Sequence, residues 1–280
     1  MSSPFSRDKL FEIARSLPPG PKVLAKLSML LQELNVGLDE VAEHIKVDSA
    51  LSARIVRMSN SVIYGGRSIG AIDEAVTRVG FREVHRLVGF VTTDRLNDRN
   101  LRFYQVDAHF MREHMLFTAV AAEALADFCD IDPHQAYTAG LLRTLGMLVL
   151  DRTAEHLTAC DLYDHGKYGH YLGWEAINFG LPNTEVSAMI LEDWRFPQAI
   201  IDGIREHYLT KASDYDNPMA CLINVAGLSV AQASLTLPGD RRHWELTQRK
   251  LDALGITEDM REMASNRAAY RFNKLRAVVA

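Results

Sequence analysis

Cysteine is scarce in this sequence of 280 residues. Only Cys129, Cys160 and Cys221 are present, far apart and in no Cys-x-x-Cys pair. An odd number of widely spaced cysteines argues against both a disulfide framework and a thiolate zinc site. We expect each cysteine to be a small buried apolar residue.

The sequence also lacks a hydrophobic run long enough to cross a bilayer. Its longest largely apolar stretch, residues 139–150, is interrupted by Arg143 and is shorter than the roughly 20 residues that a spanning helix needs. Charged side chains between Arg7 and Glu12 interrupt the first apolar positions, where a secretory signal needs an uncharged core. We therefore expect no membrane partner and a cytoplasmic location.

Positive charge is not in excess. The chain has 31 lysine and arginine residues against 36 aspartate and glutamate residues, a formal net charge of −5. This balance gives no overall attraction to phosphate backbones and disfavours nucleic acid as a partner. A glycine-rich phosphate loop and a His-Glu-x-x-His motif are also missing from the sequence, so ATP hydrolysis and that type of zinc site have no support.

What the sequence does contain is helical periodicity. The composition, 48% hydrophobic and 24% charged, is that of an ordinary globular chain with a sizeable core. Apolar residues recur at steps of three and four, the spacing of one helix face, without convincing strand alternation. A representative set is Val23, Leu24, Leu27, Leu30, Leu31 and Leu34. The sequence therefore predicts an all-α, multi-helix bundle.

Capping residues set some of the expected helix boundaries. Asp48 is placed to cap a helix, because its carboxylate can accept hydrogen bonds from unpaired amides at a helix N-terminus. A long helix is expected over residues 110–128. An Asp-Pro pair at Asp132 predicts the start of another helix, running to about Leu150.

A charged, connection-like segment over residues 94–102 indicates a boundary between two helical units. We expect an N-terminal helical bundle over residues 1–100 and a second helical unit with a C-terminal helical extension over residues 101–280. The segment is short and lacks the glycine and serine of a flexible tether, so the two units are expected to behave as one rigid body.

Short motifs follow one another in a consistent order between residues 17 and 208. The N-terminal set comprises Leu17-Pro18-Pro19, residues 36–48, Asn60-Ser61, Tyr64-Gly65, Ile72-Asp73-Glu74-Ala75-Val76 and Gly80. The second set comprises Ala139-Gly140-Leu141-Leu142, Gly146, Glu175, Gly180-Leu181, Glu185-Val186, Trp194, Pro197 and His207. Together they resemble the HDOD domain, the output-domain relative of the HD phosphohydrolases. The resemblance implies a degenerate HD-like helical core in the second unit and a role in bacterial signal transduction.

The metal-binding pattern implied by that resemblance is broken. It needs a first histidine, matched by His114, and then an adjacent His-Asp pair, whose places are taken by Arg143 and Thr144. Arginine stays protonated in proteins and offers no lone pair, so it repels a cation. A unit positive charge ~4 Å from a divalent ion would cost on the order of 8 kcal/mol at an effective dielectric near 20.

The later ligand positions are incomplete as well. Asn183 stands where some relatives have another histidine, Gly227 is matched to a later aspartate, and His207 keeps a late histidine. Thr144 adds to the loss, because a neutral hydroxyl replaces a carboxylate that could bridge two ions. We therefore expect no metal, no cofactor and no catalysis, and interpret the chain as a signalling scaffold that acts through protein–protein contacts.

Other interpretations of Arg143 stay open. Its guanidinium could bind a phosphate in the vacated pocket beside His114 and His207, which would make the chain a nucleotide or anion sensor. Alternatively, it could pair internally with an acid such as Glu175 or Glu185. A phosphohydrolase with a rearranged metal site is the remaining alternative.

Two features are candidate contacts for a signalling partner. Tyr64 follows a predicted helix and precedes a glycine turn. Near the C-terminus Arg267, Arg271 and Lys274 fall at i, i+4 and i+7 on one helix face. This basic stripe is either a solvated face favoured by the helix C-terminus or a patch for an acidic partner.

Overall fold

The computed structural model describes residues 7–18, 20–30, 37–66 and 68–279. Its first helices are α1 (Arg7–Ser16), α2 (Gly20–Leu30), α3 (Leu38–Lys46), α4 (Ser49–Ser59), α5 (Ile72–Val79) and α6 (Phe81–Leu96). The next are α7 (Ala108–Ala126), α8 (Pro133–Leu142), α9 (Leu145–Ala154), α10 (His165–Tyr168), α11 (Tyr171–Asn178) and α12 (Asn183–Asp193). The last are α13 (Gln198–Glu206), α14 (Pro218–Gln232), α15 (Gln248–Leu254) and α16 (Glu258–Val279).

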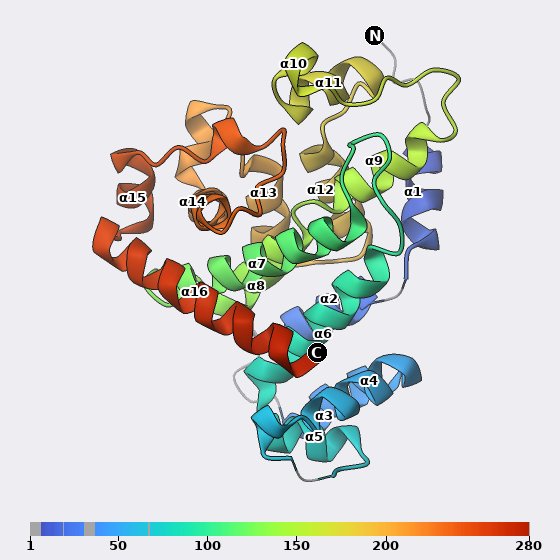
Figure 1. Ribbon diagram of the computed structural model, residues 1–280, viewed down its shortest axis with the longest axis vertical. Helices are drawn as coiled ribbons and strands as arrows, with labels where there is room; N and C mark the ends of the chain where they lie inside the picture. Colours follow the sequence, from blue (N-terminus) through green and yellow to red (C-terminus); the bar gives the residue numbers. More distant parts are fainter. Residues whose placement is uncertain (1–6, 19, 31–36, 67, 280) are drawn as a thin grey trace.

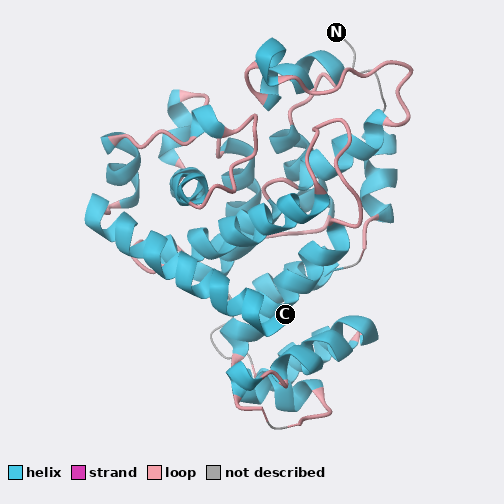
Figure 2. Ribbon diagram, in the orientation of Figure 1, coloured by secondary structure: helices cyan, strands magenta, loops and turns pink. Residues whose placement is uncertain are grey.

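Loops and short 3-10 turns join these helices (Figure 2). Over the described ranges, the only β-type pairing is one isolated bridge between Leu101 and Val106. The all-α prediction is confirmed. The expected helix face around Val23 belongs to α2, whereas Leu31 and Leu34 lie outside the described residues. None of the described helices is long and apolar enough to cross a membrane.

Helix α7 lies at the centre of the larger group of helices (Figure 1) and packs against α8, α14 and α16. Most of its residues from Met111 to Ala126 are buried, so it presents no continuous face to water. Helices α3, α4 and α5 form a smaller group, and α6 runs from that group to the rest of the molecule.

Polar contacts join the first hundred residues to the rest. The guanidinium of Arg86 on α6 binds both oxygens of Glu123 on α7, with N–O distances of 2.9 and 3.0 Å. Glu123 is buried, and a two-point Arg–carboxylate bond fixes orientation as well as distance. Ser28 of α2 also meets Thr138 of α8 at 3.1 Å. That the two parts move as one body stays a prediction.

The cap predictions are confirmed where the structure shows them. Asp48 accepts a hydrogen bond from the backbone N–H of Leu51 at 2.8 Å, at the start of α4. Asp132 accepts one from Gln135 at 2.8 Å, at the start of α8. Both caps are set by residues three apart in the sequence, which is why they can be predicted locally.

The single helix expected from Asp132 to about Leu150 is wrong. Helix α8 ends at Leu142, the chain turns at Arg143 and Thr144, and α9 begins at Leu145. Gly146 then allows α9 to pack closely on α12: a Cβ there would lie 2.0 Å from the Asn183 carbonyl oxygen, so only glycine lets the two helices approach this closely. The turn also directs the side chain of Arg143 into the interior.

Candidate functional site

Three residues that the sequence assigns to the broken metal site meet in the interior. His114 comes from α7, Arg143 from the turn between α8 and α9, and His207 from the residue after α13. All three are at most 1% exposed. The structure therefore brings together side chains that lie far apart in the sequence, with 93 positions between His114 and His207.

Arg143 is neutralised by Asp240, at the start of a 3-10 turn over Arg241–His243. Its Nη2 lies 2.6 Å from Oδ2 of Asp240, which is fully buried. The other oxygen, Oδ1, accepts a hydrogen bond of 2.7 Å from the Tyr208 hydroxyl. An internal ion pair of Arg143 is one of the alternatives left open by the sequence. The prediction that its partner is Glu175 or Glu185 is wrong, because the partner is Asp240.

Glu175 is held by other donors. It accepts hydrogen bonds from the Tyr104 hydroxyl at 2.6 Å and from the backbone and side chain of Asn183 at 2.8 to 3.0 Å. Burial raises the pKa of Glu175 to about 7, although these donors favour the carboxylate. Glu185 instead faces Arg205 at 3.2 Å. Asn183 therefore belongs to the Glu175 site and does not contact Arg143.

Both histidines direct a lone pair at Arg143. Its Nη2 donates to His114 Nε2 at 2.5 Å, and its Nη1 donates to His207 Nε2 at 3.2 Å. The opposite Nδ1 atoms lie 2.7 Å from the carbonyl oxygens of Leu235 and Ile204, respectively, and must donate to them. Each imidazole is thus fixed as the neutral tautomer with its proton on Nδ1.

The electrostatics agree with this assignment. Burial, followed by the positive charge of Arg143, lowers the pKa values of His114 and His207 to about 3. Burial alone would raise the pKa of Asp240, but the attraction of Arg143 and the other contacts of the carboxylate, including the hydrogen bond from Tyr208, together outweigh burial and keep that pKa below its ordinary value. The cluster is therefore one cation, one anion and two neutral imidazoles.

Trp244 closes one side of the cluster. Its ring centroid is 5.0 Å from the guanidinium carbon of Arg143, within the range of a cation–π contact. Gly227 of α14 makes room for the indole, because a Cβ at this position would lie 2.4 Å from Trp244 Cδ2. The glycine matched to a missing aspartate thus lies against an aromatic ring.

Thr144 contributes no compensating ligand. Its side chain is fully buried, and its hydroxyl has no hydrogen-bond partner among the described residues. An HD-type metal would have to take the lone pairs that His114 and His207 now direct at Arg143. No group of three His, Cys, Asp or Glu side chains suited to a metal ion occurs within the described ranges. The residues at this site do not fit a metal.

Tyr64, a candidate contact residue, is partly buried. Its hydroxyl donates to Glu83 at 2.5 Å, and the ammonium group of Lys274 lies 5.2 Å from its ring centroid. Lys274 also lies 3.6 Å from Glu83. Tyr64, in the 3-10 turn Val62–Tyr64, and Lys274 of α16 therefore meet at Glu83 of α6 instead of projecting separately into solvent.

The remaining cations of the basic stripe face α7. Arg271 Nη2 lies 2.6 Å from Asp127, and Arg267 lies 3.6 Å from the same carboxylate. The side chain of Arg271 is only 18% exposed, so the stripe is not simply a solvated face. Its role in partner binding stays a prediction.

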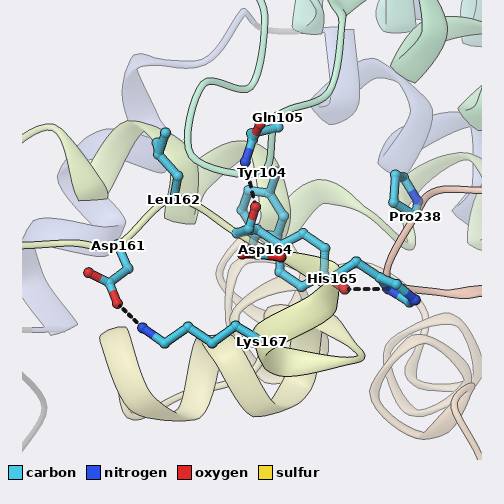
Figure 3. Close-up of a pocket in the computed structure, with 9 residues that line it drawn as sticks. Tyr104, Gln105, Asp161, Leu162, Asp164, His165, Lys167 and Pro238 are labelled. Carbon is cyan, nitrogen blue, oxygen red and sulfur yellow. Dashed lines mark hydrogen bonds and ion pairs between the residues drawn. The ribbon is translucent and has the colours of Figure 1, made fainter.

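A separate hollow of about 780 Å³ opens beside α10 (Figure 3). Lys167 lies 2.7 Å from Asp161, and Asp164 caps the backbone N–H of Gly166. Gln105 is likewise bonded to a backbone carbonyl. Among the described lining residues, the hollow therefore offers no lysine or arginine free to select an anionic ligand.

The sequence profile of the HDOD domain matches residues 17–210, which is more than half of the chain. This chain belongs to the HDOD domain family. Asp240 and Trp244 lie beyond the matched residues, so the groups that neutralise and cover Arg143 come from outside the HDOD match.

Solved structures share the HDOD fold over nearly the whole chain. An HDOD domain protein of unknown function from Geobacter sulfurreducens is 20% identical with a TM-score of 0.68, and the alignment covers 98% of each chain. A provisionally named phosphohydrolase from Shewanella amazonensis is 22% identical with a TM-score of 0.61, covering 96% of this chain and 97% of that one. These likenesses establish the fold.

A curated relative, an uncharacterised protein from Treponema pallidum, is 24% identical over 224 residues. The alignment covers 76% of this chain but only 42% of that protein. The chain therefore spans less than half the length of this curated relative.

Proposed function

We propose that this HDOD protein is a non-catalytic signal-transduction scaffold that works by contacting other signalling proteins. The observation that carries the proposal is the buried guanidinium of Arg143, which receives the lone pairs of His114 and His207 and the charge of Asp240. A structurally related protein from Marinobacter aquaeolei carries the provisional name of a signal transduction protein, which supports the same setting.

Hydrolysis by an HD-type site would need neutral imidazoles with free lone pairs and carboxylates around a metal. Here the imidazoles are neutral, but their lone pairs already accept hydrogen bonds from Arg143. A divalent ion placed among them would also meet a permanent positive charge at close range. The arrangement favours a structural role for the former HD site over catalysis.

The sensor alternative is less well supported. An anion binding to Arg143 would have to replace Asp240, a buried carboxylate that Tyr208 also holds. Of the guanidinium nitrogens, Nε is buried without a partner among the described residues, and it offers one donor only. A single buried donor is a poor basis for recognising a nucleotide phosphate.

The enzyme alternative rests on a specific observation, the provisional naming of two Shewanella amazonensis neighbours as phosphohydrolases, one of them metal-dependent. A panel of phosphomonoesters and phosphodiesters, assayed with added Mg²⁺, Mn²⁺ or Fe²⁺, separates the two proposals. We expect wild type and Arg143→Ala to be equally inactive. Turnover by wild type that Arg143→Ala abolishes would overturn the scaffold proposal.

The same preparation tests the sensor alternative. A ligand that binds only the folded state raises its apparent stability. We expect no nucleotide to shift the melting temperature of wild type. A nucleotide that raises it, with the shift lost in His114→Ala and His207→Ala, would make the former HD site a ligand pocket. The cytoplasmic location and the identity of the signalling partner remain part of the proposal.

A further inference from the structure

A groove runs along the exposed face of α2, and we call it the α2 groove. It consists of two hollows of about 550 and 540 Å³ that share Lys22, Lys26 and His44 in their walls. Residues from α1, α3, the start of α4, α6 and the end of α12 complete the walls. The α2 groove is distinct from the Arg143 site, whose residues do not line it.

The floor and edges of the α2 groove carry exposed apolar groups. Met29 is 51% exposed and Val47 is 77% exposed, and the partly buried indole of Trp194 adds an aromatic surface. The opposite face of α2 packs into the core through Leu24 and Leu27, which are fully buried. Helix α2 thus has an inner apolar face and a second, partly apolar face turned outward.

Basic side chains surround this apolar surface. Among the described residues, the two hollows are lined by five lysine and arginine residues, counting shared ones once, against two carboxylates, those of Asp48 and Asp193. Those two carboxylates already face Arg95 and Arg15. The remaining cations, Lys22, Lys26 and Arg195, are exposed and form no ion pair with a carboxylate of the described residues. The groove is therefore locally basic on a chain of net charge −5.

Arg195 is held in an unusual backbone conformation at the edge of the groove. Its φ is +60°, in the left-handed region that glycine adopts more readily than residues with a Cβ. The conformation ends α12 through hydrogen bonds from Arg195 N to Glu192 O and from Phe196 N to Leu191 O, each 3.0 Å. An arginine at a position where glycine would fit better points to a use for its side chain.

We infer that the α2 groove docks an acidic amphipathic helix of a partner protein, an inference that rests on the proposed scaffold function. The exposed Met29 and Val47, with the partly buried Trp194, match a stripe of apolar side chains, and the unpaired cations match flanking aspartate and glutamate. A helix satisfies its own backbone hydrogen bonds, which suits a surface whose walls are helices and offer no strand edge to extend.

Nucleic acid fits the same groove less well. A nucleic-acid backbone would meet the cations but has no counterpart for the exposed methionine and valine side chains, and the net charge of −5 opposes a long polyanion. The occupant that satisfies both the charge and the apolar surface is therefore a peptide.

The test is selection from a display library of random peptides, with the full-length wild-type chain as bait. We expect enriched peptides to have acidic residues flanking apolar residues at i, i+3, i+4 and i+7. Their binding is then followed by tryptophan fluorescence. Trp194 is partly buried in the groove wall, whereas Trp174 and Trp244 are at most 3% exposed, so a spectral change reports mainly on Trp194.

A charge-reversed pair, Lys22→Glu with Lys26→Glu, should weaken peptide binding by about tenfold or more and reduce its salt dependence. The matched control is Arg57→Glu with Arg242→Glu, which changes the net charge equally at exposed positions outside the groove. Arg195→Gly should weaken binding while leaving the melting temperature nearly unchanged, because glycine accepts the left-handed conformation.

Three outcomes would overturn the inference. The first is enrichment of basic peptides, and the second is an equal loss of binding in the groove variant and in its control. The third is a single-stranded oligonucleotide that binds more tightly than the selected peptides and whose binding the groove variant abolishes. These outcomes are independent of the phosphoester assay. Peptide binding elsewhere on an inactive protein would reject the groove and keep the scaffold proposal, whereas phosphoester turnover would reject the scaffold proposal whatever the groove binds.

Discussion

Replacing Asp240 by asparagine tests the Arg143 cluster most sharply. Asparagine keeps the shape of the side chain and an oxygen for the Tyr208 hydroxyl, but it removes the only carboxylate paired with Arg143 among the described residues. Arg143 is 1% exposed and Asp240 fully buried, so water cannot replace the lost charge. Removing one partner of a buried ion pair costs about 3–5 kcal/mol, and we expect Asp240→Asn to fall in that range.

The assay is urea unfolding at pH 7, followed by circular dichroism, with the free energy taken from the midpoint and slope. The matched control is Asp161→Asn, which removes a carboxylate 2.7 Å from Lys167 on the surface, where both side chains are more than half exposed. We expect this control to be nearly neutral, because exposed pairs contribute little to stability. Equal effects of the two substitutions would refute the argument from burial.

A second variant separates the charge from the general cost of mutating the core. Arg143→Met combined with Asp240→Asn removes both charges. The double variant should therefore lose clearly less unfolding free energy than the two single variants lose together. The coupling also has a pH signature. The attraction of Arg143 helps to keep the pKa of Asp240 in the folded state below its ordinary value. The stability that the Asp240 carboxylate contributes is therefore present above its pKa in the unfolded state, and it is lost as pH falls through its pKa in the folded state.

Three further predictions follow from other sites. Burial raises the pKa of Glu175 from 4.5 to about 7, so the folded state stays protonated at pH values where the unfolded state has lost the proton. The free energy of unfolding should therefore fall by about 3 kcal/mol as pH rises from 4.5 to 7, and Glu175→Gln should flatten this dependence on pH. Gly227→Ala should cost about 1–3 kcal/mol in urea unfolding, because the new Cβ meets Trp244, whereas Gly70→Ala, with open space around it, should be nearly neutral. Limited proteolysis should not release two stable fragments at residues 94–102, since ion pairs such as that of Glu123 join the two parts; two separately folded fragments would contradict a single rigid body.

The features that could be predicted from the sequence are those fixed by neighbouring residues. Asp48 and Asp132 cap helices through amides three positions away, so their role is visible in a short window. The same holds for the apolar spacing that predicts an all-α fold. The break at Arg143 has no local signal, because neither proline nor glycine marks it. It accompanies the close approach of Gly146 to α12, which only tertiary packing sets.

The partner of Arg143 could not be found in the same way. The need for an acid follows from burying a cation, but Asp240 is 97 positions away in a loop with no periodic pattern. Glu175 and Glu185 are the acids that the sequence analysis offers, but Tyr104 and Asn183 hold Glu175, and Glu185 faces Arg205. Pro238 and Gly239 before Asp240 predict a turn, but they do not indicate what its carboxylate contacts.

If the guanidinium of Arg143 occupies the place of a metal ion, the wild-type chain should hold no ion at this site. The metal content of the purified protein measures this occupancy most directly. The measurement is elemental analysis of wild type and of the double variant Arg143→His with Thr144→Asp, both purified without chelator and then dialysed with Mn²⁺. We expect far less than one ion per wild-type chain and a gain in the double variant, which restores a neutral ligand and a carboxylate. One tightly held ion per wild-type chain, or equal content in the two proteins, would contradict the account.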